Sequence, residues 1–388
     1  MRVRRCACLL LEPRERLAFD LRLLADGGSG LHTLTEWIAL APHRGDAVVL
    51  DPSEIGVLGV LSPGRWSDLD ELAGAHPREV IESLLQKGLL VAEGSENGRR
   101  DRLLRDTHWR NAAAAMHYAS RWRGVDTEAA EREFARGTSG ELLDRLGTPP
   151  AAVREWPGAS ARRALPAPPR SALDALLDAR VTCRNFDPER GLDEATFSAV
   201  LHRVFGARAL DERTAGIRLL KKGVPSAGGL HATEAYLLVR RVEGIAPGLY
   251  HYHPVEHSLA TLRVLGAAEG ADLARRFVAA QPYFLDAPVL VLPTARFRRT
   301  FWKYRDHAKA YRALVLDVGH LSQTLYLAAT ELGLGAFITA AINEVDIEEA
   351  FGLDPLEEGP LAVCGFGHRA AGRRETEFDP LGAVWPAQ

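Results

Sequence analysis

A turn of small residues that leads into an apolar strand is the feature that most constrains the fold of this chain. Residues 225–231 read Pro-Ser-Ala-Gly-Gly-Leu-His, and residues 235–239 follow as a run of strand-forming side chains. Glycines let backbone N–H groups approach a flat or anionic ligand, because no Cβ stands in the way. Residues 248–254 then read as a second short strand closed by a turn. The pattern predicts a ligand-facing turn beside two consecutive strands.

Length, composition and charge indicate a globular protein of more than one domain. A chain of 388 residues is too long for one ordinary core. Its hydrophobic content of 46% and charged content of 26% are typical of soluble proteins. The net charge of −3 gives no reason to expect nucleic acid as a partner. No apolar run approaches the roughly 20 residues of a membrane span, and we expect neither a membrane partner nor a signal peptide.

The cysteines and histidines do not form a recognisable metal site. Cys6, Cys8, Cys183 and Cys364 are too few and too scattered for a disulfide framework. Cys6 and Cys8 also lack the spacing and the second pair of a zinc site. The four histidines of residues 231–257 would alternate between the faces of a strand. We therefore expect no metal and a reducing, cytoplasmic location.

Residues 1–95 are predicted to form a small, winged-helix-like α+β domain. A strand at 47–50, helices at 52–61 and 67–72, a helix from Pro77 and a strand at 89–91 give the order of a winged helix. A DNA-reading helix would be basic. Here Arg78 and Lys87 are balanced by Glu79 and Glu82, so we do not expect DNA binding.

The rest of the chain is predicted to hold a connector and an α+β catalytic domain. Residues 96–170 carry helical patterns over 111–123 and 127–146 and then a proline-rich stretch. Residues 171–388 alternate helices and strands. The predicted helices are 171–179, 193–205, 268–280, 308–332 and 347–351, and the later strands are 288–292, 336–339 and 360–364. The 308–332 helix is apolar on several sides, which a homodimer interface would explain.

An arginine-rich motif follows the first helix of the predicted catalytic domain. Arg180, Thr182 and Arg184 place two guanidinium groups around a hydroxyl. Forked donors with a fixed charge suit a phosphate monoester. On its own the motif also fits solvated arginines at a helix end, so the residues alone leave both interpretations open.

Together these motifs resemble the SagB-type peptide dehydrogenases, a branch of the FMN-dependent nitroreductase superfamily. The superfamily's flavin-phosphate motif is Arg-x-Ser-x-Arg/Lys-x-Phe, which residues 180–186 match with threonine in place of serine. The resemblance implies a nitroreductase-like mixed sheet flanked by helices, with bound FMN. The implied cofactor-binding residues are Arg180, Thr182, Arg184, Pro225, Ser226, Ala227, Gly228, Gly335 and Arg369.

A Lys-Tyr pair is the candidate for catalysis. Lysine occurs at only five positions in this arginine-rich chain, and one of them is Lys303 beside Tyr304. Lysine can lose its proton when it is desolvated, whereas arginine cannot. On residue chemistry alone, the pair and its neighbouring arginines also fit a solvated surface. Azoline-oxidising relatives carry an adjacent Lys-Tyr pair, so the resemblance implies that Lys303 and Tyr304 act as a base or polarise the substrate ring.

The resemblance also implies an activity and partners. It implies an FMN-dependent dehydrogenase that oxidises azoline rings to azoles in a ribosomally made precursor peptide. Expected partners are that peptide, a second copy of the chain and a cyclodehydratase or other maturation enzyme. Residues 1–95 would hold the leader peptide by strand addition at 48–50 or 89–91, or would only stabilise the dimer. Alternatives are reduction of dehydroamino acids or nitro compounds, and a non-catalytic peptide-binding scaffold.

Overall fold

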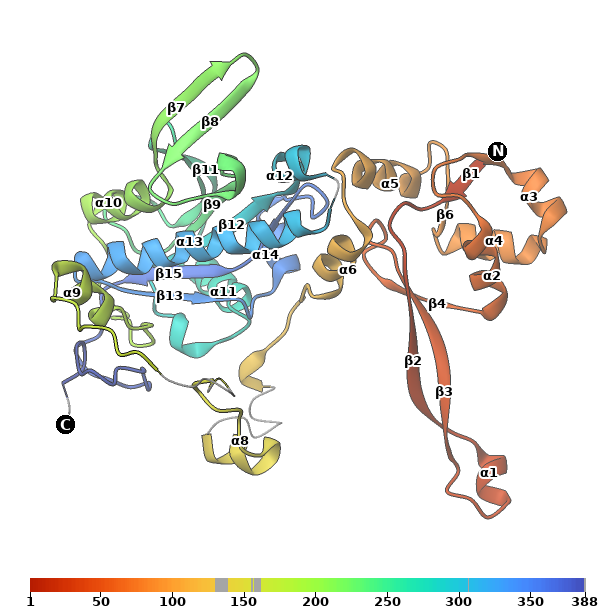
Figure 1. The fold of residues 1–388 in the computed structure, drawn as a ribbon, viewed down its shortest axis with the longest axis horizontal. Helices are drawn as coiled ribbons and strands as arrows, with labels where there is room; N and C mark the ends of the chain where they lie inside the picture. Colours follow the sequence, from red (N-terminus) through yellow and green to blue (C-terminus); the bar gives the residue numbers. More distant parts are fainter. Residues whose placement is uncertain (130–138, 155, 157–161, 306, 387–388) are drawn as a thin grey trace. The chain divides into compact units, whose positions relative to one another are not determined.

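The computed structural model describes residues 1–129, 139–154, 156, 162–305 and 307–386, and the chain divides into two units (Figure 1). The first unit comprises Met1–Arg121, Ala295–Leu316 and Gly352–Gly359. The second comprises Trp122–Thr294, Asp317–Phe351 and Pro360–Gln388. The first unit thus extends beyond residue 95 and takes two segments from the 171–388 region.

The first unit contains the helices and strands predicted over residues 47–91. Its small sheet has the order β5-β1-β6, and α2, α3 and α4 pack beside it through a core that includes Leu58, Ile81 and Leu84. The helix predicted at 67–72 begins at Leu69, and the Asp68 side chain caps its N-terminus. The elements are β1 (Arg2–Arg5), α2 (Pro52–Val60), β5 (Ser67–Asp68), α3 (Leu69–Ala75), α4 (Arg78–Gln86) and β6 (Leu90–Ala92).

A long hairpin in the first unit was not predicted. Strands β2 (Leu10–Phe19) and β3 (Leu31–Leu40) pair over ten residues, with α1 (Leu21–Ala25) between them, and β4 (Ala47–Leu50) adds to the base of β3. Charged residues fill much of β2, which hides its strand pattern. The hairpin extends away from α2, α3 and α4 and carries α1 at its far end (Figure 1).

An aromatic cluster ties the later segments into the first unit. The Trp109 ring lies 4.6 Å from the Phe297 ring and 4.9 Å from the Phe301 ring, measured between centroids. The Trp109 indole donates a hydrogen bond to the carbonyl of Leu356 at 2.9 Å. These contacts join α12, 190 residues away in sequence, to the helices of the N-terminal region. The helices are α5 (Glu96–Asp106), α6 (Asn111–Ala119) and α12 (Phe297–Tyr304).

The predicted connector is described only in part. Of the helix predicted over 127–146, the segment Ser139–Leu146 forms α8, while residues 130–138 lie outside the described residues. From Gly147 to Arg170 the described residues contain neither helix nor strand, as expected for a proline-rich stretch.

The second unit is an α+β domain built on one sheet with the strand order β11-β10-β9-β12-β15-β13, in which β14 also pairs with β12. The predicted α+β class is confirmed, whereas the winged-helix-like form of residues 1–95 stays a prediction. The sheet strands are β9 (Thr233–Val239), β10 (Gly248–His253), β11 (Ser258–Val264), β12 (Val289–Arg296), β13 (Gly335–Thr339), β14 (Glu358–Pro360) and β15 (Val363–Gly367).

Both faces of this sheet are buried under helices. Leu237, Val289 and Val291 point to a core shared with α10 and α13, whereas Leu238 and Leu290 point to a core shared with α11 and α14. The alternation of one strand residue to each face explains the continuous apolar runs in the sequence. The helices are α9 (Ala172–Ala179), α10 (Glu194–Phe205), α11 (Ala267–Phe277), α13 (Lys309–Glu331) and α14 (Glu344–Phe351).

A second hairpin, in the second unit, was not predicted. Strands β7 (Ala207–Thr214) and β8 (Ile217–Lys222) pair with each other immediately before the 225–231 turn. Most of their side chains are exposed, and the strands are rich in charged residues, so an apolar alternation is absent. The hairpin projects from the rest of the second unit (Figure 1).

Two further features are the state of the cysteines and the hydrophobicity of the helices. All four cysteines are buried and unbonded to one another. Burial raises the pKa of each thiol to about 12. Among the helices that the structure describes, none combines the length and the hydrophobicity that a membrane crossing requires.

Candidate cofactor site

The arginine motif runs as an extended segment along the edge of the large sheet. Thr182 forms a parallel bridge with Ala336 of β13, and the amide of Cys183 donates to the Ala336 carbonyl at 2.9 Å. A Cβ on Gly335 would lie 2.5 Å from the Cys183 sulfur, so glycine allows this close approach. Phe186 bridges to Arg369, which follows β15. The fold therefore brings the motif, Gly335 and Arg369 together.

Tyr326 of α13 organises the first half of the motif. Its hydroxyl and the Thr182 hydroxyl are 2.9 Å apart, and it also accepts a hydrogen bond from the Ile338 amide. Burial raises the pKa of Tyr326, so the phenol stays protonated at neutral pH. The Arg180 guanidinium lies 5.3 Å from the centre of the Tyr326 ring. Among the described residues, Arg180 makes no ion pair.

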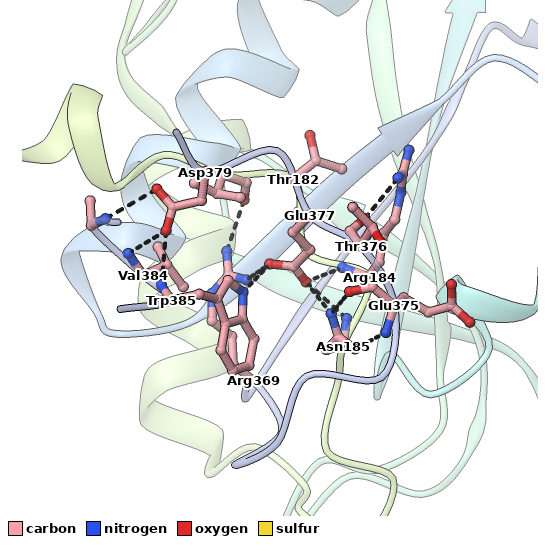
Figure 2. Close-up of polar contacts among 12 residues, drawn as sticks. Thr182, Arg184, Asn185, Arg369, Glu375, Thr376, Glu377, Asp379, Val384 and Trp385 are labelled. Atoms are coloured by element: carbon pink, nitrogen blue, oxygen red, sulfur yellow. Dashed lines mark hydrogen bonds and ion pairs between the residues drawn. The ribbon is translucent and has the colours of Figure 1, made fainter. Parts of the chain in front are cut away.

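The second half of the motif surrounds the carboxylate of Glu377, as Figure 2 shows. One oxygen of Glu377 accepts from the amides of Arg184 and Asn185 at 2.6 and 3.0 Å and from the Asn185 side chain at 2.9 Å. The other accepts from Arg369 and from the Trp385 indole, both at 2.7 Å. The Glu377 side chain is fully buried. Sequence reasoning missed Glu377 because nothing local marks a distant acidic residue as the partner of this motif.

The Glu377 carboxylate is ionised by its partners. Burial alone would raise its pKa, but hydrogen bonds from Trp385, Arg184 and Asn185 and the charge of Arg369 outweigh it and lower the pKa. A carboxylate that accepts several N–H bonds favours its charged form. Glu377 therefore supplies a fixed negative charge beneath the motif.

The C-terminal segment holds this arrangement in place. Asp379 accepts hydrogen bonds from the amides of Ala383, Val384 and Trp385, which fixes the turn that presents the Trp385 indole (Figure 2). The Arg184 guanidinium donates to the carbonyl of Thr376 at 2.9 Å. Arg184 and Arg369 are thus engaged by this segment, whereas Arg180 is not.

The 225–229 turn is fixed from α13. Ser226 donates its hydroxyl hydrogen to Asp317 at 2.6 Å, and the amide of Ala227 donates to the same carboxylate at 3.1 Å. Gly228 has a φ of 62°, in the left-handed region that glycine adopts without strain. Pro225 and Ser226 line a small recess with Asp317 and Leu321. Sequence reasoning placed Asp317 in the long helix without assigning it this role.

The turn and the arginine motif contact opposite sides of α13. Asp317 and Tyr326 are nine residues apart on this helix. Nine residues correspond to about 2.5 turns and about 13.5 Å of rise. Asp317 and Tyr326, and the motifs that they hold, therefore project from opposite faces of the helix.

Lys303 and Tyr304 belong to the first unit. They lie at the end of α12, whose Phe297, Thr300 and Phe301 are buried. Lys303 is exposed, and its ammonium lies 5.6 Å from the centre of the Tyr304 ring. The pair therefore belongs to a different unit from the cofactor residues, which lie in the second unit.

The residues near Arg180 fit a phosphate monoester. Arg180 supplies a charge with no ion-pair partner in the described part of the chain, and Thr182 supplies a hydroxyl held in position by Tyr326. Forked N–H donors beside a hydroxyl suit phosphate oxygens. The glycine turn allows a flat ring to approach the backbone. The donor set of this chain is thus compatible with FMN.

The comparisons with known proteins place the chain in a family. The model of the "Nitroreductase family" matches residues 177–368. A protein named as a nitroreductase, MJ1384 of Methanocaldococcus jannaschii, is 34% identical over 148 residues, which cover 38% of this chain and 71% of that protein. The chain belongs to the nitroreductase family.

Two further relatives carry names from peptide processing. The trifolitoxin-processing protein TfxB of Rhizobium leguminosarum bv. trifolii is 31% identical over 37% of this chain. The microcin B17-processing protein McbC of Escherichia coli is 25% identical over 38% of this chain. The match spans 39% of TfxB and 54% of McbC, so it covers only part of each relative.

Proposed function

We propose that the protein is an FMN-dependent dehydrogenase of the SagB type that acts in the maturation of a ribosomally made peptide. The FMN assignment rests on Arg180, Thr182 and Tyr326, which offer a positive charge and an oriented hydroxyl beside Gly335 at the start of β13. The similarity to TfxB and McbC supports a peptide as the substrate class.

The cofactor-binding roles divide between two groups of residues. Arg180 and Thr182 would bind the phosphate, with Arg184 and Arg369 held close by the Glu377 network. Pro225, Ser226, Ala227 and Gly228 would contact the flavin ring, in an orientation fixed by Asp317. Bound FMN would supply a two-electron acceptor.

The proposed reaction is the oxidation of an azoline ring to an azole. This oxidation removes two hydrogen atoms from adjacent ring atoms, formally one hydride and one proton. FMN would take the hydride, and dioxygen or another oxidant would later reoxidise it. Lys303 and Tyr304 would take the proton or polarise the ring. Both are on α12, where Lys303 is open to solvent and can meet a large substrate.

A homodimer would bring the two motifs into one site. Because Asp317 and Tyr326 face opposite sides of α13, the turn and the arginine motif of one chain would serve two different cofactors. A second copy would complete each site. Val315 and Leu316 of α13 are 48% and 59% exposed, and burial of such apolar side chains would stabilise a dimer.

The first unit is proposed to hold the leader peptide, in a cytoplasmic setting where a cyclodehydratase or another maturation enzyme acts on the same peptide. Strand β4 is one of the two outer strands of the β2-β3-β4 sheet, and β6 is one of the two outer strands of the β5-β1-β6 sheet. Outer strands have unpaired backbone groups, which strand addition requires.

The test combines cofactor, mass and product. The purified protein should be yellow with non-covalent FMN, and light scattering should give about twice the chain mass of 42.4 kDa. An azoline-containing peptide should lose two hydrogen atoms, detected by mass spectrometry. Colourless protein that cannot take up FMN would refute the flavin assignment. Addition of hydrogen to a dehydroamino acid or nitro substrate, without azoline oxidation, would identify a reductase.

A further inference from the structure

A basic cavity lies in the first unit, between the end of α5 and the start of α6. Its volume is about 570 Å³. No carboxylate occurs among its nine lining residues, which are Ala7, Cys8, Leu104, Arg105, His108, Trp109, Arg110, Asn111 and Arg305. Neither the arginine motif nor the Lys303–Tyr304 pair contributes to it.

One N–H group of Arg105, at the cavity wall, has no hydrogen-bond acceptor in the described part of the chain. Its Nε donates to Asp101 at 2.8 Å, but its buried Nη2 has no hydrogen-bond partner in the described part of the chain. A buried guanidinium N–H without an acceptor is costly, whereas an acceptor in the cavity would recover that energy. This unsatisfied donor points to a ligand with acceptor oxygens.

Backbone carbonyls hold the other two arginines at the wall. Arg110 donates from Nε to the carbonyl of Arg305 at 2.7 Å. Arg305 donates from Nε and Nη2 to the carbonyl of Trp302 at 3.1 and 2.9 Å. A carbonyl oxygen carries no net charge, so the two bonds to Trp302 fix the Arg305 guanidinium and leave its charge in place.

The surroundings of the cavity are electropositive. Desolvation lowers the pKa of His108, and the charges of Arg305, Arg298 and Arg110 lower it further, while Asp106 opposes them. The first turn of α6 has no acidic residue, and no side chain caps its N-terminus. The helix dipole therefore adds positive potential at Asn111.

We infer that this cavity binds carboxylate side chains of an acidic segment of the precursor peptide, an inference that rests on the proposed peptide substrate. Exposed Lys303 of α12 lies two residues before Arg305 and extends the positive charge beyond the cavity, while Arg298 and Trp302 line a neighbouring pocket together with Glu357 and Glu358. A surface that extends beyond one cavity suits a chain of acidic residues better than a single small anion. The same surface leads to Lys303, the proposed catalytic lysine.

Fluorescence anisotropy with a fluorescein-labelled oligo-glutamate peptide tests the inference on the full chain. The wild type should bind it, with an affinity that falls as salt rises. The double variant Arg110→Ala/Arg305→Ala should bind at least about tenfold more weakly, because it loses two cations that would contact the carboxylates. Arg102→Ala, an exposed arginine of α5 outside the cavity, is the matched control and should bind as the wild type does. An oligo-glutamine peptide should not bind.

Each outcome decides the inference. Equal oligo-glutamate affinity in the wild type and the double variant would overturn it, as would tighter binding of a single-stranded oligonucleotide that the double variant abolishes. Inorganic phosphate that displaces the peptide only at concentrations far above those of the peptide fits the inference. FMN content is measured on the same samples. Normal flavin without peptide binding would refute this inference alone, whereas peptide binding without flavin would refute the flavin assignment alone.

Discussion

The two units use arginine in opposite ways. In the second unit, Arg369 and the backbone of Arg184 close around Glu377, whose carboxylate accepts five hydrogen bonds. In the first unit, the Arg305 guanidinium is held by the carbonyl oxygen of Trp302 at the wall of an open cavity. The difference lies in the partner. A buried carboxylate turns an arginine into a structural element, whereas a carbonyl leaves its charge available to a ligand.

The largest effect is expected where the carboxylate is removed. Glu377→Ala would leave Arg369 and the amides of Arg184 and Asn185 without their acceptor. Breaking a buried charge pair from one side lowers the free energy of unfolding by about 3–5 kcal/mol. Urea denaturation would measure the loss. Glu375→Ala is the control, because Glu375 is exposed and contributes only backbone groups here. If Glu377→Ala had the same urea midpoint as the wild type, Glu377 would not stabilise the second unit, and the contrast with the first unit would be wrong.

The exposed cations of the first unit should affect turnover and leave folding unchanged. Lys303→Ala or Tyr304→Phe should slow flavin reduction by substrate about 10²-fold, roughly 2.7 kcal/mol, if the pair moves a proton. Thermal midpoints and flavin spectra should stay as in the wild type. Stopped-flow absorbance would give the rates, with Lys309→Ala as a control lysine of the same unit. If both variants reduced flavin at nearly the wild-type rate, Lys303 and Tyr304 would be ordinary surface residues without a catalytic role.

Arg180 and Arg184 offer a comparison within one motif. Arg180 makes no ion pair in the described residues, so Arg180→Ala should weaken FMN binding by at least about tenfold, from the loss of about 1.5–3 kcal/mol, with little change in apoprotein stability. Arg184→Ala should lower both the FMN affinity and the apoprotein stability, because the Arg184 guanidinium also donates a hydrogen bond to the carbonyl of Thr376. FMN fluorescence titration and apoprotein melting would separate the two quantities. Equal loss of stability in both variants would contradict the division.

The smallest effect is a pH dependence. The folded-state pKa of Glu377 lies below its unfolded value of about 4.3. Its stabilising contribution is therefore complete above that value and is lost as the pH falls through the lower, folded-state pKa. Glu377→Gln should flatten the acid limb of the stability profile, measured by denaturation at a series of pH values. If the stability of Glu377→Gln fell as steeply at acid pH as that of the wild type, other carboxyl groups would cause the acid loss of stability.

The elements with local signals were predictable. The apolar runs of β9, β12 and β13 and the amphipathic α4 and α10 all appear near their predicted bounds, because burial on the sheet or along a helix face imposes a short sequence period. The two hairpins β2–β3 and β7–β8 were missed. Their strands are largely exposed and charged, so pairing between backbones defines them, and backbone pairing leaves little trace in side-chain pattern.

The candidate site was predictable in its motifs but not in its supports. Arg180, Thr182 and the 225–228 turn carry short-range patterns that the family resemblance identifies. Glu377 lies almost 200 residues from the motif that it holds, and Asp317 lies about 90 residues from Ser226. Such partners are set by tertiary packing, for which one sequence gives no spacing rule. The division of the chain between two units is equally non-local, since α12 joins the first unit through Trp109.

The burial of all four thiols has a practical consequence for the experiments above. Burial raises the pKa of each thiol to about 12, so the thiols stay protonated at neutral pH, and the thiolate is the form that reacts with maleimides and oxidants. The native chain is therefore almost silent toward thiol reagents. A cysteine introduced at exposed Leu17 of the β2–β3 hairpin or at exposed Asn111 of the cavity would be a single attachment point for a fluorophore. Such labels could report peptide contact at chosen places without removal of any native residue that packs in the core.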